Sequence, residues 1–224
     1  MITRLPPWVG IGAGLLALIA GSINVIALLE LGMAVTHLTG TTSLLAAALV
    51  GAKPMAFAPF AWTIFAYLLG TIVSGVIIQD SMLRLGRRYS VALLIESLLL
   101  WLAIPLISHH LHGGLICLAA AAGLQNAMVS TYSGALLRTT HLTGMFTDLG
   151  VFIGHALRGL PVQTRRLRLC LIVISGFFAG GLLGAWTHEL WSLGALMVPA
   201  SLTALLAAFY WVYYWLKAGQ IPSH

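Results

Sequence analysis

Charged residues are scarce in this chain of 224 residues, which has 11 Lys and Arg, five Asp and Glu, and only 7% charged residues in all. A water-soluble domain carries roughly 25% charged residues, so the shortage excludes that class of protein. The apolar residues form runs of about 20, the length with which a helix crosses a hydrocarbon core about 30 Å thick. We therefore predict an all-α integral membrane protein that has the lipid bilayer as its surroundings.

Cysteine and catalytic motifs are also nearly absent. Cys117 and Cys170 lie inside apolar runs and form neither a disulfide framework nor a metal-ligand spacing. No nucleophile elbow, zinc-protease motif or phosphate loop occurs, so we expect no enzymatic activity, no metal and no cofactor. The net charge of +6 resides in short loops between apolar runs, so a nucleic-acid partner is not expected.

Six long apolar runs predict six transmembrane helices, at about residues 8–32, 56–79, 90–107, 113–134, 169–187 and 192–216. Two further segments, 36–52 and 140–158, are too short or too interrupted to cross. If neither crosses, ten of the eleven Lys and Arg share one side of the membrane and only Lys53 faces the other. Positive residues favour the cytoplasmic side. We therefore predict two re-entrant half-helices, with the N- and C-termini in the cytoplasm.

An internal repeat divides the chain, because the pentapeptide Thr-His-Leu-Thr-Gly occurs at 36–40 and again at 140–144. Two flanking features recur in the same order: Ala20-Gly21-x-x-Asn24 with Ala122-Gly123-x-x-Asn126, and the ladder Ala66, Gly70, Ser74 with Gly176, Gly180, Gly184. Each half has three crossings, so the halves lie in opposite orientations. We predict an inverted 3+3 repeat, about residues 8–107 and 113–216, within one membrane domain that covers residues 1–224.

Inverted repeats of transporters hold substrate where broken helices from the two halves meet near the midplane. Helix N-termini attract acceptor groups, Thr hydroxyls satisfy freed backbone amides, and imidazole carries a proton near neutral pH. For Asp148, an intramembrane carboxylate, a His or Arg partner is expected. The predicted site for a small polar or anionic solute comprises Asn24, Thr36, His37, Thr39, Gly40, Thr41, Asn126, Thr140, His141, Thr143, Gly144 and Asp148.

Structural roles explain the same residues without a ligand. Thr and Gly cap buried half-helices, a neutral His bonds a carbonyl, and Asn joins helices in lipid. For Glu30 and Glu96, placement at the membrane interface and a functional role are both compatible with the sequence. A small-solute transporter or channel is the leading hypothesis. The alternative is a non-transporting membrane scaffold or sensor. Assembly into a homo-oligomer is compatible with either function.

The repeated elements resemble those of the YoaK family of bacterial inner-membrane proteins. The resemblance lies in Ala20–Asn24, Thr36–Thr42, Gly123–Ala127 and Arg138–Gly150, and it extends over most of the chain. It implies a multi-pass protein of the bacterial inner (cytoplasmic) membrane whose biochemical role is unassigned. The chain departs from the family at two positions, since relatives often have Asp where it has Asn24 and Asn where it has Thr41.

The predicted topology can be tested by cysteine labelling in a background that lacks Cys117 and Cys170. Because residues 36–52 do not cross, Lys53→Cys should react with a membrane-impermeant maleimide in intact cells. Gly86→Cys should react only after the cytoplasmic side is opened. Labelling of position 53 from the cytosol, or of position 86 from outside, contradicts the topology.

Overall fold

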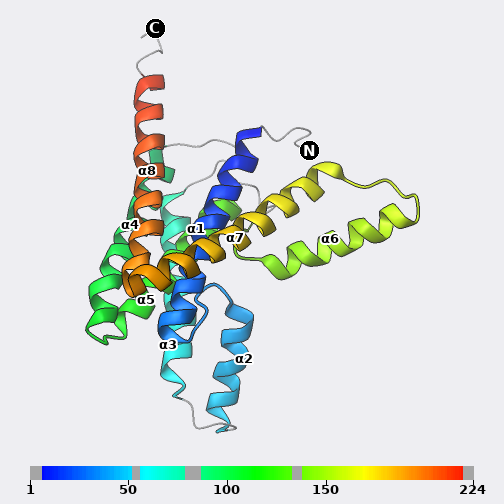
Figure 1. Ribbon diagram of the computed structural model, residues 1–224. Helices are drawn as coiled ribbons and strands as arrows, with labels where there is room; N and C mark the ends of the chain where they lie inside the picture. Colours follow the sequence, from blue (N-terminus) through cyan, green and yellow to red (C-terminus); the bar gives the residue numbers. More distant parts are fainter. Residues whose placement is uncertain (1–6, 52–55, 79–86, 133–137, 219–224) are drawn as a thin grey trace.

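The computed structural model describes residues 7–51, 56–78, 87–132 and 138–218, which contain helices and no strand. The helices are α1 (Pro7–Leu31), α2 (Leu38–Leu49), α3 (Ala58–Ile77), α4 (Arg87–Ser108), α5 (Gly113–Tyr132), α6 (Leu142–Leu157), α7 (Thr164–Trp191), the short 3-10 helix η1 (Ser192–Leu196) and α8 (Met197–Ala218) (Figure 1). The described residues do not include Arg4, Lys53 and Arg84, which contribute to the charge distribution predicted from the sequence.

Each apolar segment found in the sequence forms a helix, which confirms the all-α class. Within the described residues, five helical segments are long and apolar enough to cross a membrane, and the last of them runs from Thr164 to Tyr213 through α7, η1 and α8. The protein is therefore a multi-pass membrane protein. Helix α7 begins at Thr164 and not near residue 169, because arginine is a good helix former and continues the helix beyond its apolar part.

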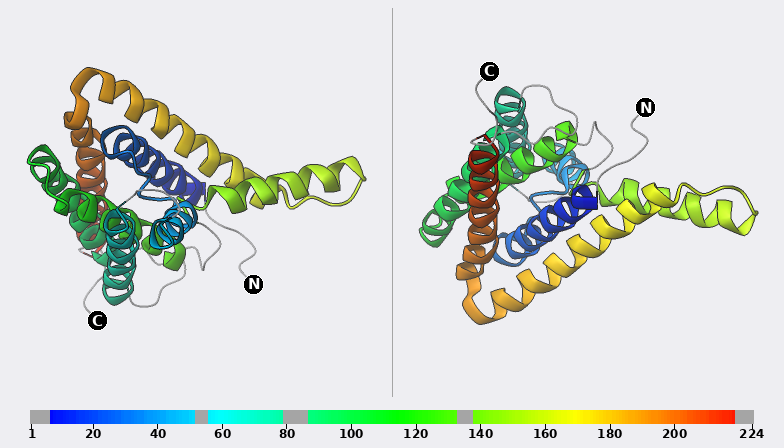
Figure 2. Two further views of the ribbon diagram at one scale, coloured as in Figure 1. Left: turned by 90° about the horizontal axis from the view of Figure 1, so that it is seen from below. Right: turned by 90° about the horizontal axis from the view of Figure 1, so that it is seen from above.

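The chain turns sharply between α7 and α8. Ser192 has a φ of 47°, a left-handed conformation that no helix interior contains. As a straight helix, the 50 residues from Thr164 to Tyr213 would be about 75 Å long. The views in Figure 2 show instead that α7 and α8 leave this corner in different directions.

Two clusters of buried apolar side chains fill the helix bundle. The first cluster comprises Val9, Ala13, Ala17, Ile78, Tyr89, Ala92, Leu93, Leu124, Met128, Val129, Met145, Phe152, Leu169, Cys170, Val173 and Ala207. The second cluster comprises Ile19, Ile23, Ile26, Ala27, Val35, Ala66, Leu100, Ala103, Ile107, Leu115, Cys117, Leu118, Ala119, Ala121, Ala122, Ala195, Leu196 and Ala200. Helices α1 and α4 thus run from the first cluster to the second, and α5 and α8 run the opposite way.

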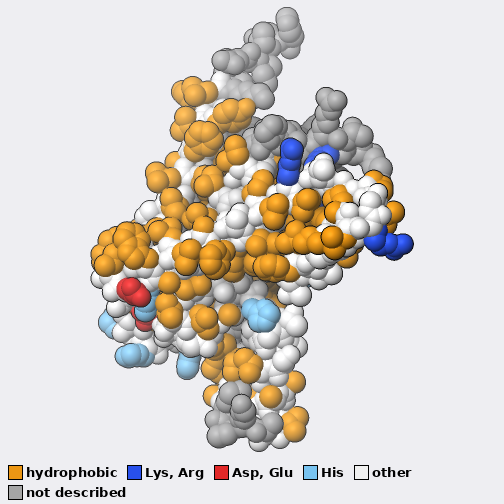
Figure 3. Space-filling view, turned by 45° about the vertical axis from the view of Figure 1, so that its right-hand side comes forward, with side chains coloured by type: hydrophobic (Ala, Val, Ile, Leu, Met, Phe, Trp, Pro, Cys, Tyr) orange, Lys and Arg blue, Asp and Glu red, His pale blue; other side chains and the backbone are white. Residues whose placement is uncertain are grey.

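The polar side chains divide between the same two ends. Arg88, Arg165 and Arg166 lie at the beginnings of α4 and α7, beside residues of the first cluster. Glu30 and His188 lie at the ends of α1 and α7, beyond the second. In Figure 3, Lys and Arg side chains lie at the top and on the right-hand side of the molecule, and acidic and histidine side chains lie lower, with apolar side chains over much of the same face.

Close backbone contact holds α1 against α7 and α3 against α5. A Cβ atom on Gly180 would overlap the carbonyl of Leu18, and one on Gly21 would overlap the carbonyl of Phe177. Between α3 and α5, a Cβ atom on Gly70 would overlap the carbonyl of Ala120, and one on Gly123 that of Tyr67. Small residues let helix backbones approach this closely in lipid, so both ladders found in the sequence lie in helix interfaces.

The two short helices lie outside these interfaces. Helix α2 packs against α3 and α6 packs against α7, whereas α2 and α6 do not contact each other. Figures 1 and 2 show α6 and the beginning of α7 extending away from the other helices. Leu157, at the end of α6, is 84% exposed. An apolar residue so exposed is suited to lipid or to a second protein surface.

The helix interfaces can be tested with a matched pair of glycines in α3. Gly70→Ala should destabilise the protein by about 1–3 kcal/mol, because its Cβ atom has no room beside Ala120. Gly75→Ala meets no atom within 4 Å and should be neutral or slightly stabilising, since alanine favours helices. Thermal unfolding of both variants in detergent distinguishes them, and equal melting temperatures would contradict this packing.

Candidate functional site

The first Thr-His-Leu-Thr-Gly motif begins deep beside α1. The Thr36 backbone N–H and Oγ1–H both donate to Asn24 Oδ1, at 3.1 Å and 2.8 Å. Asn24 precedes Leu31, the end of α1, by seven residues, or about 10 Å along the helix. The chain therefore folds back along α1 before α2 starts, and Thr36 is buried at that depth.

The second motif folds back along α5 in a similar way. Thr139 Oγ1 donates to Gln125 Oε1 at 3.5 Å, and Gln125 Nε2 donates to the Leu16 carbonyl of α1 at 3.2 Å. Sequence reasoning missed Gln125, although a glutamine inside an apolar run beside the predicted Asn126 was a visible signal. It is buried and ties the second motif to α1.

Asn126 differs from its counterpart in the first half. Its Oδ1 atom is buried and accepts no hydrogen bond from the residues that the structure describes. The Tyr67 hydroxyl of α3 interacts with the side chains of Asn126 and Thr140. The second motif thus involves a third helix, whereas Asn24 bonds Thr36 directly.

Each motif histidine lies across the first turn of its helix. His37 and His141 occupy the N-cap positions of α2 and α6 with similar backbone angles, φ −102° and ψ 66° against φ −93° and ψ 55°. Neither side chain caps its helix. A Cβ atom on Gly40 would overlap the His37 ring, and one on Gly144 would overlap the His141 ring. The ring thus lies in the space that a side chain three residues later would occupy, which fits the glycine at that position of the motif.

The polar faces of the two motifs are largely exposed. His37, Thr39, His141 and Thr143 are all exposed in the structure, and Thr140 is half-buried. Thr41 is buried, and its hydroxyl donates to the His37 carbonyl at 3.1 Å. The rings and two of the threonines are thus available to solvent or a ligand, whereas Thr41 stabilises the helix start.

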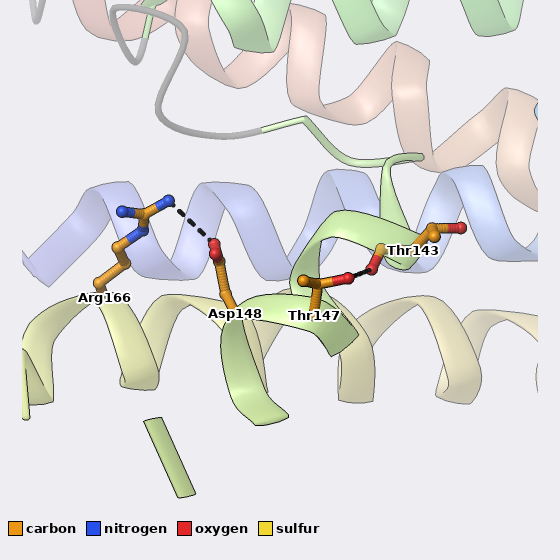
Figure 4. A network of polar contacts seen from close by, with 4 residues as sticks. All are labelled: Thr143, Thr147, Asp148 and Arg166. Atoms are coloured by element: carbon orange, nitrogen blue, oxygen red, sulfur yellow. Dashed lines mark hydrogen bonds and ion pairs between the residues drawn. The ribbon is translucent and has the colours of Figure 1, made fainter. Parts of the chain in front are cut away.

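Asp148 pairs with an arginine, one of the two partner types expected from the sequence. Its Oδ2 atom lies 3.0 Å from Nη2 of Arg166, and the Asp148 and Arg166 side chains are 32% and 48% exposed. Figure 4 shows this pair linking α6 to α7, with Thr147 one residue away donating to the Thr143 carbonyl at 2.9 Å. Asp148 therefore fixes α6 on α7 and remains accessible.

The predicted residues form two separate groups, not one joint site. The first group comprises Asn24, Thr36, His37, Thr39, Gly40 and Thr41. The second comprises Asn126, Thr140, His141, Thr143, Gly144 and Asp148. The expectation that the two elements meet in the middle is wrong, because α2 and α6 make no contact. The second motif is instead linked to α1, because Gln125 bonds both Thr139 and the Leu16 carbonyl.

Comparison with protein families gives a match to the model described as "Protein of unknown function (DUF1275)" over residues 12–209. That range includes both motifs and nearly all of the helix bundle. The chain belongs to the DUF1275 family. The match agrees with the resemblance to YoaK proteins. Neither the search of curated proteins nor that of solved structures found a match.

Two glutamates of this DUF1275 protein lie in contrasting places. Glu30 Oε1 is 2.8 Å from His188 Nε2, and both side chains are about one-fifth exposed at 22% and 21%, so the pair joins the ends of α1 and α7. Glu96 is 0% exposed in the middle of α4, which excludes an interfacial place for it. No group of three potential metal ligands occurs within the described ranges.

A double-mutant cycle tests the contact between histidine and glycine. Gly40→Ala alone should destabilise α2, because its Cβ atom displaces the His37 ring. In a His37→Ala background the same change should be nearly harmless, which gives a coupling energy of about 1–3 kcal/mol in detergent unfolding. The equivalent pair, Gly144→Ala and His141→Ala, should behave alike, and additive effects in both pairs would disprove the contact.

Proposed function

We propose that this protein is a transporter or channel for a small polar or anionic solute in the bacterial inner membrane. One observation carries the proposal. Two copies of a polar motif fold back about 10 Å along α1 and α5 inside an otherwise apolar bundle, and each leaves a histidine and a threonine exposed. Exposed polar groups at membrane depth are tolerated only where protein or a wet cavity surrounds them.

The proposed topology has six crossings, with α2 and α6 as re-entrant half-helices and both termini in the cytoplasm. The helix directions support it: α1 and α4 run from the first cluster to the second, and α5 and α8 run back. The arginines at the beginnings of α4 and α7 favour the cytoplasmic side for the first cluster. The turn at Ser192 supports separate crossings for α7 and α8.

An inverted repeat accounts for the paired contacts. Gly21 meets the Phe177 carbonyl in one interface, and Gly123 meets that of Tyr67 in the other. The residues correspond in the repeat, since Gly21 aligns with Gly123 and Tyr67 precedes Gly70 as Phe177 precedes Gly180. The two motif histidines also occupy equivalent positions in the repeat, since His37 aligns with His141. Two opposed half-sites on either side of the bundle centre follow from this arrangement.

Each proposed half-site consists of an N-cap histidine, exposed threonine hydroxyls and the N-terminus of a half-helix. Free amides and the helix dipole at such a terminus favour an anion or a solute with acceptor groups. The half-sites differ in charge, because the second has the Asp148–Arg166 pair and the first has Leu44 at the corresponding place.

A non-transporting scaffold or sensor is the second candidate. It is favoured by the absence of contact between α2 and α6, and by the hydroxyls of Thr41 and Thr147, which bond their own helices. In this alternative the motifs serve only to fold the chain back, and a second copy of the chain covers their exposed faces. This alternative predicts a sealed bundle that passes no solute.

Reconstituted protein in liposomes, screened with small anions and polar solutes at equal and unequal pH, tests transport. Asp148→Asn and His141→Ala should lower flux at least about tenfold, because the first removes a negative charge and the second removes an imidazole from the second half-site. Ser175→Ala is the control, since its exposed hydroxyl bonds only the carbonyls of its own helix. Absence of flux for the whole panel favours the scaffold, and normal flux in both variants removes these residues from the mechanism.

A further inference from the structure

Glu96 is an isolated acid in the interior of the bundle. The residue is 0% exposed, and neither carboxyl oxygen has a hydrogen-bond partner among the residues that the structure describes. It lies nine residues from Arg87 and twelve from Ser108, more than about 13 Å from either end of α4. An intramembrane ionisable residue is by default a functional residue, and neither motif accounts for this one.

Glu96 lies where the two apolar clusters meet, at a level of the bundle that also contains buried polar residues. Along α4, Ala92 and Leu93 belong to the first cluster and Leu100 to the second, so Glu96 falls between them. On α8, Thr203 lies between Ala200 of the second cluster and Ala207 of the first. On α5 the second cluster ends at Ala122 and the first begins at Leu124, next to buried Gln125.

Contacts at this level join α4 to its neighbours. Ser97, next to Glu96, donates its hydroxyl to the Ala200 carbonyl of α8 at 2.8 Å. Thr203 donates to the Pro199 carbonyl of its own helix at 2.7 Å. The hydroxyl groups of Ser97 and Thr203 thus donate to backbone carbonyls, and neither donates a hydrogen bond to the Glu96 carboxyl group.

No charged side chain compensates Glu96 from the helices packed against α4. Helices α3, α5 and η1 contain no Asp, Glu, Lys or Arg, and Lys217 of α8 lies 17 residues beyond Ala200, about 25 Å along the helix. On α4 itself, Arg88 lies eight residues away, or about 12 Å. The other titratable residues of these helices are Tyr67, Tyr89, Cys117, Tyr132, Tyr210, Tyr213 and Tyr214.

The chemistry of such a place favours a proton. An ionised carboxylate without a partner is very costly in an apolar interior, whereas the neutral acid loses only hydrogen bonds to water. A well-packed apolar side chain of similar volume would avoid even that cost. The glutamate is therefore a disadvantage for stability alone, which points to a use in which the acid gains and loses its proton.

We propose that Glu96 is an exchangeable proton-binding site at the centre of the bundle. The carboxylate takes one proton from water when α4 separates from α8 or α5 toward one side, and the neutral acid returns it when the bundle opens toward the other. A use of this proton in coupling rests on the proposed transport function. Binding and exchange of the proton do not.

Infrared spectroscopy of the full-length protein in lipid tests the proposal directly. The carbonyl stretching band of a protonated carboxylic acid should be present in the native protein at neutral pH. It should shift after transfer to D₂O, because the proton exchanges with solvent. Glu96→Gln should remove the band, and so should Glu96→Leu, a second variant that replaces the buried acid with an apolar side chain. Glu30→Gln should retain it, since Glu30 lies beside His188 at the end of the bundle.

The outcomes separate this proposal from that of transport. A native protein without the band has an ionised Glu96, which overturns the proposal. So does a band that does not shift in D₂O, since the proton is then sealed in, and so does a band that survives both substitutions at position 96. A failed flux screen with a shifting band removes transport and leaves the proton site standing.

Discussion

The structure depends on the close backbone contact of α1 with α7 and of α3 with α5. In lipid no hydrophobic effect drives helices together, so packing and polar contacts decide which helices associate. Glycines at 21, 70, 123 and 180 allow carbonyl groups of the partner helix to occupy the space of a side chain. These two interfaces join residues more than 40 positions apart in the sequence and leave α2 and α6 at the outside.

The motifs follow from that packing. With α1 and α5 fixed in the bundle, Asn24 and Gln125 present acceptors at depth, and the chain after each helix folds back to donate to them through Thr36 and Thr139. Backbone outside a helix needs such partners where water is scarce. The histidine and glycine of each motif then form the start of a short helix. The histidine ring lies in the space that a Cβ atom on the glycine would occupy.

The few acidic residues of this chain lie in different surroundings. The sequence has five acidic residues. Among the described ones, Asp148 pairs with Arg166 and Glu30 pairs with His188, whereas Glu96 lies buried with no hydrogen-bond partner among the described residues. In an apolar interior of low dielectric constant, charges interact more strongly than in water and an ionised acid without a partner is costly. The place of each acid in the bundle therefore decides which partner it meets and what it can do.

The sequence by itself determined the membrane class, the helical segments, the repeat and the family-like motifs, because runs of apolar residues and repeated residues are local patterns. Only the tertiary structure decided that α2 and α6 do not meet, that Arg166 is the partner of Asp148, and that Gln125 is part of the second motif. It also decided that Glu96 is buried, although the sequence already showed that Glu96 lies inside an apolar run. Burial and partnership depend on which helix faces the residue, and for segments far apart in the chain the backbone contacts at the glycines set that choice.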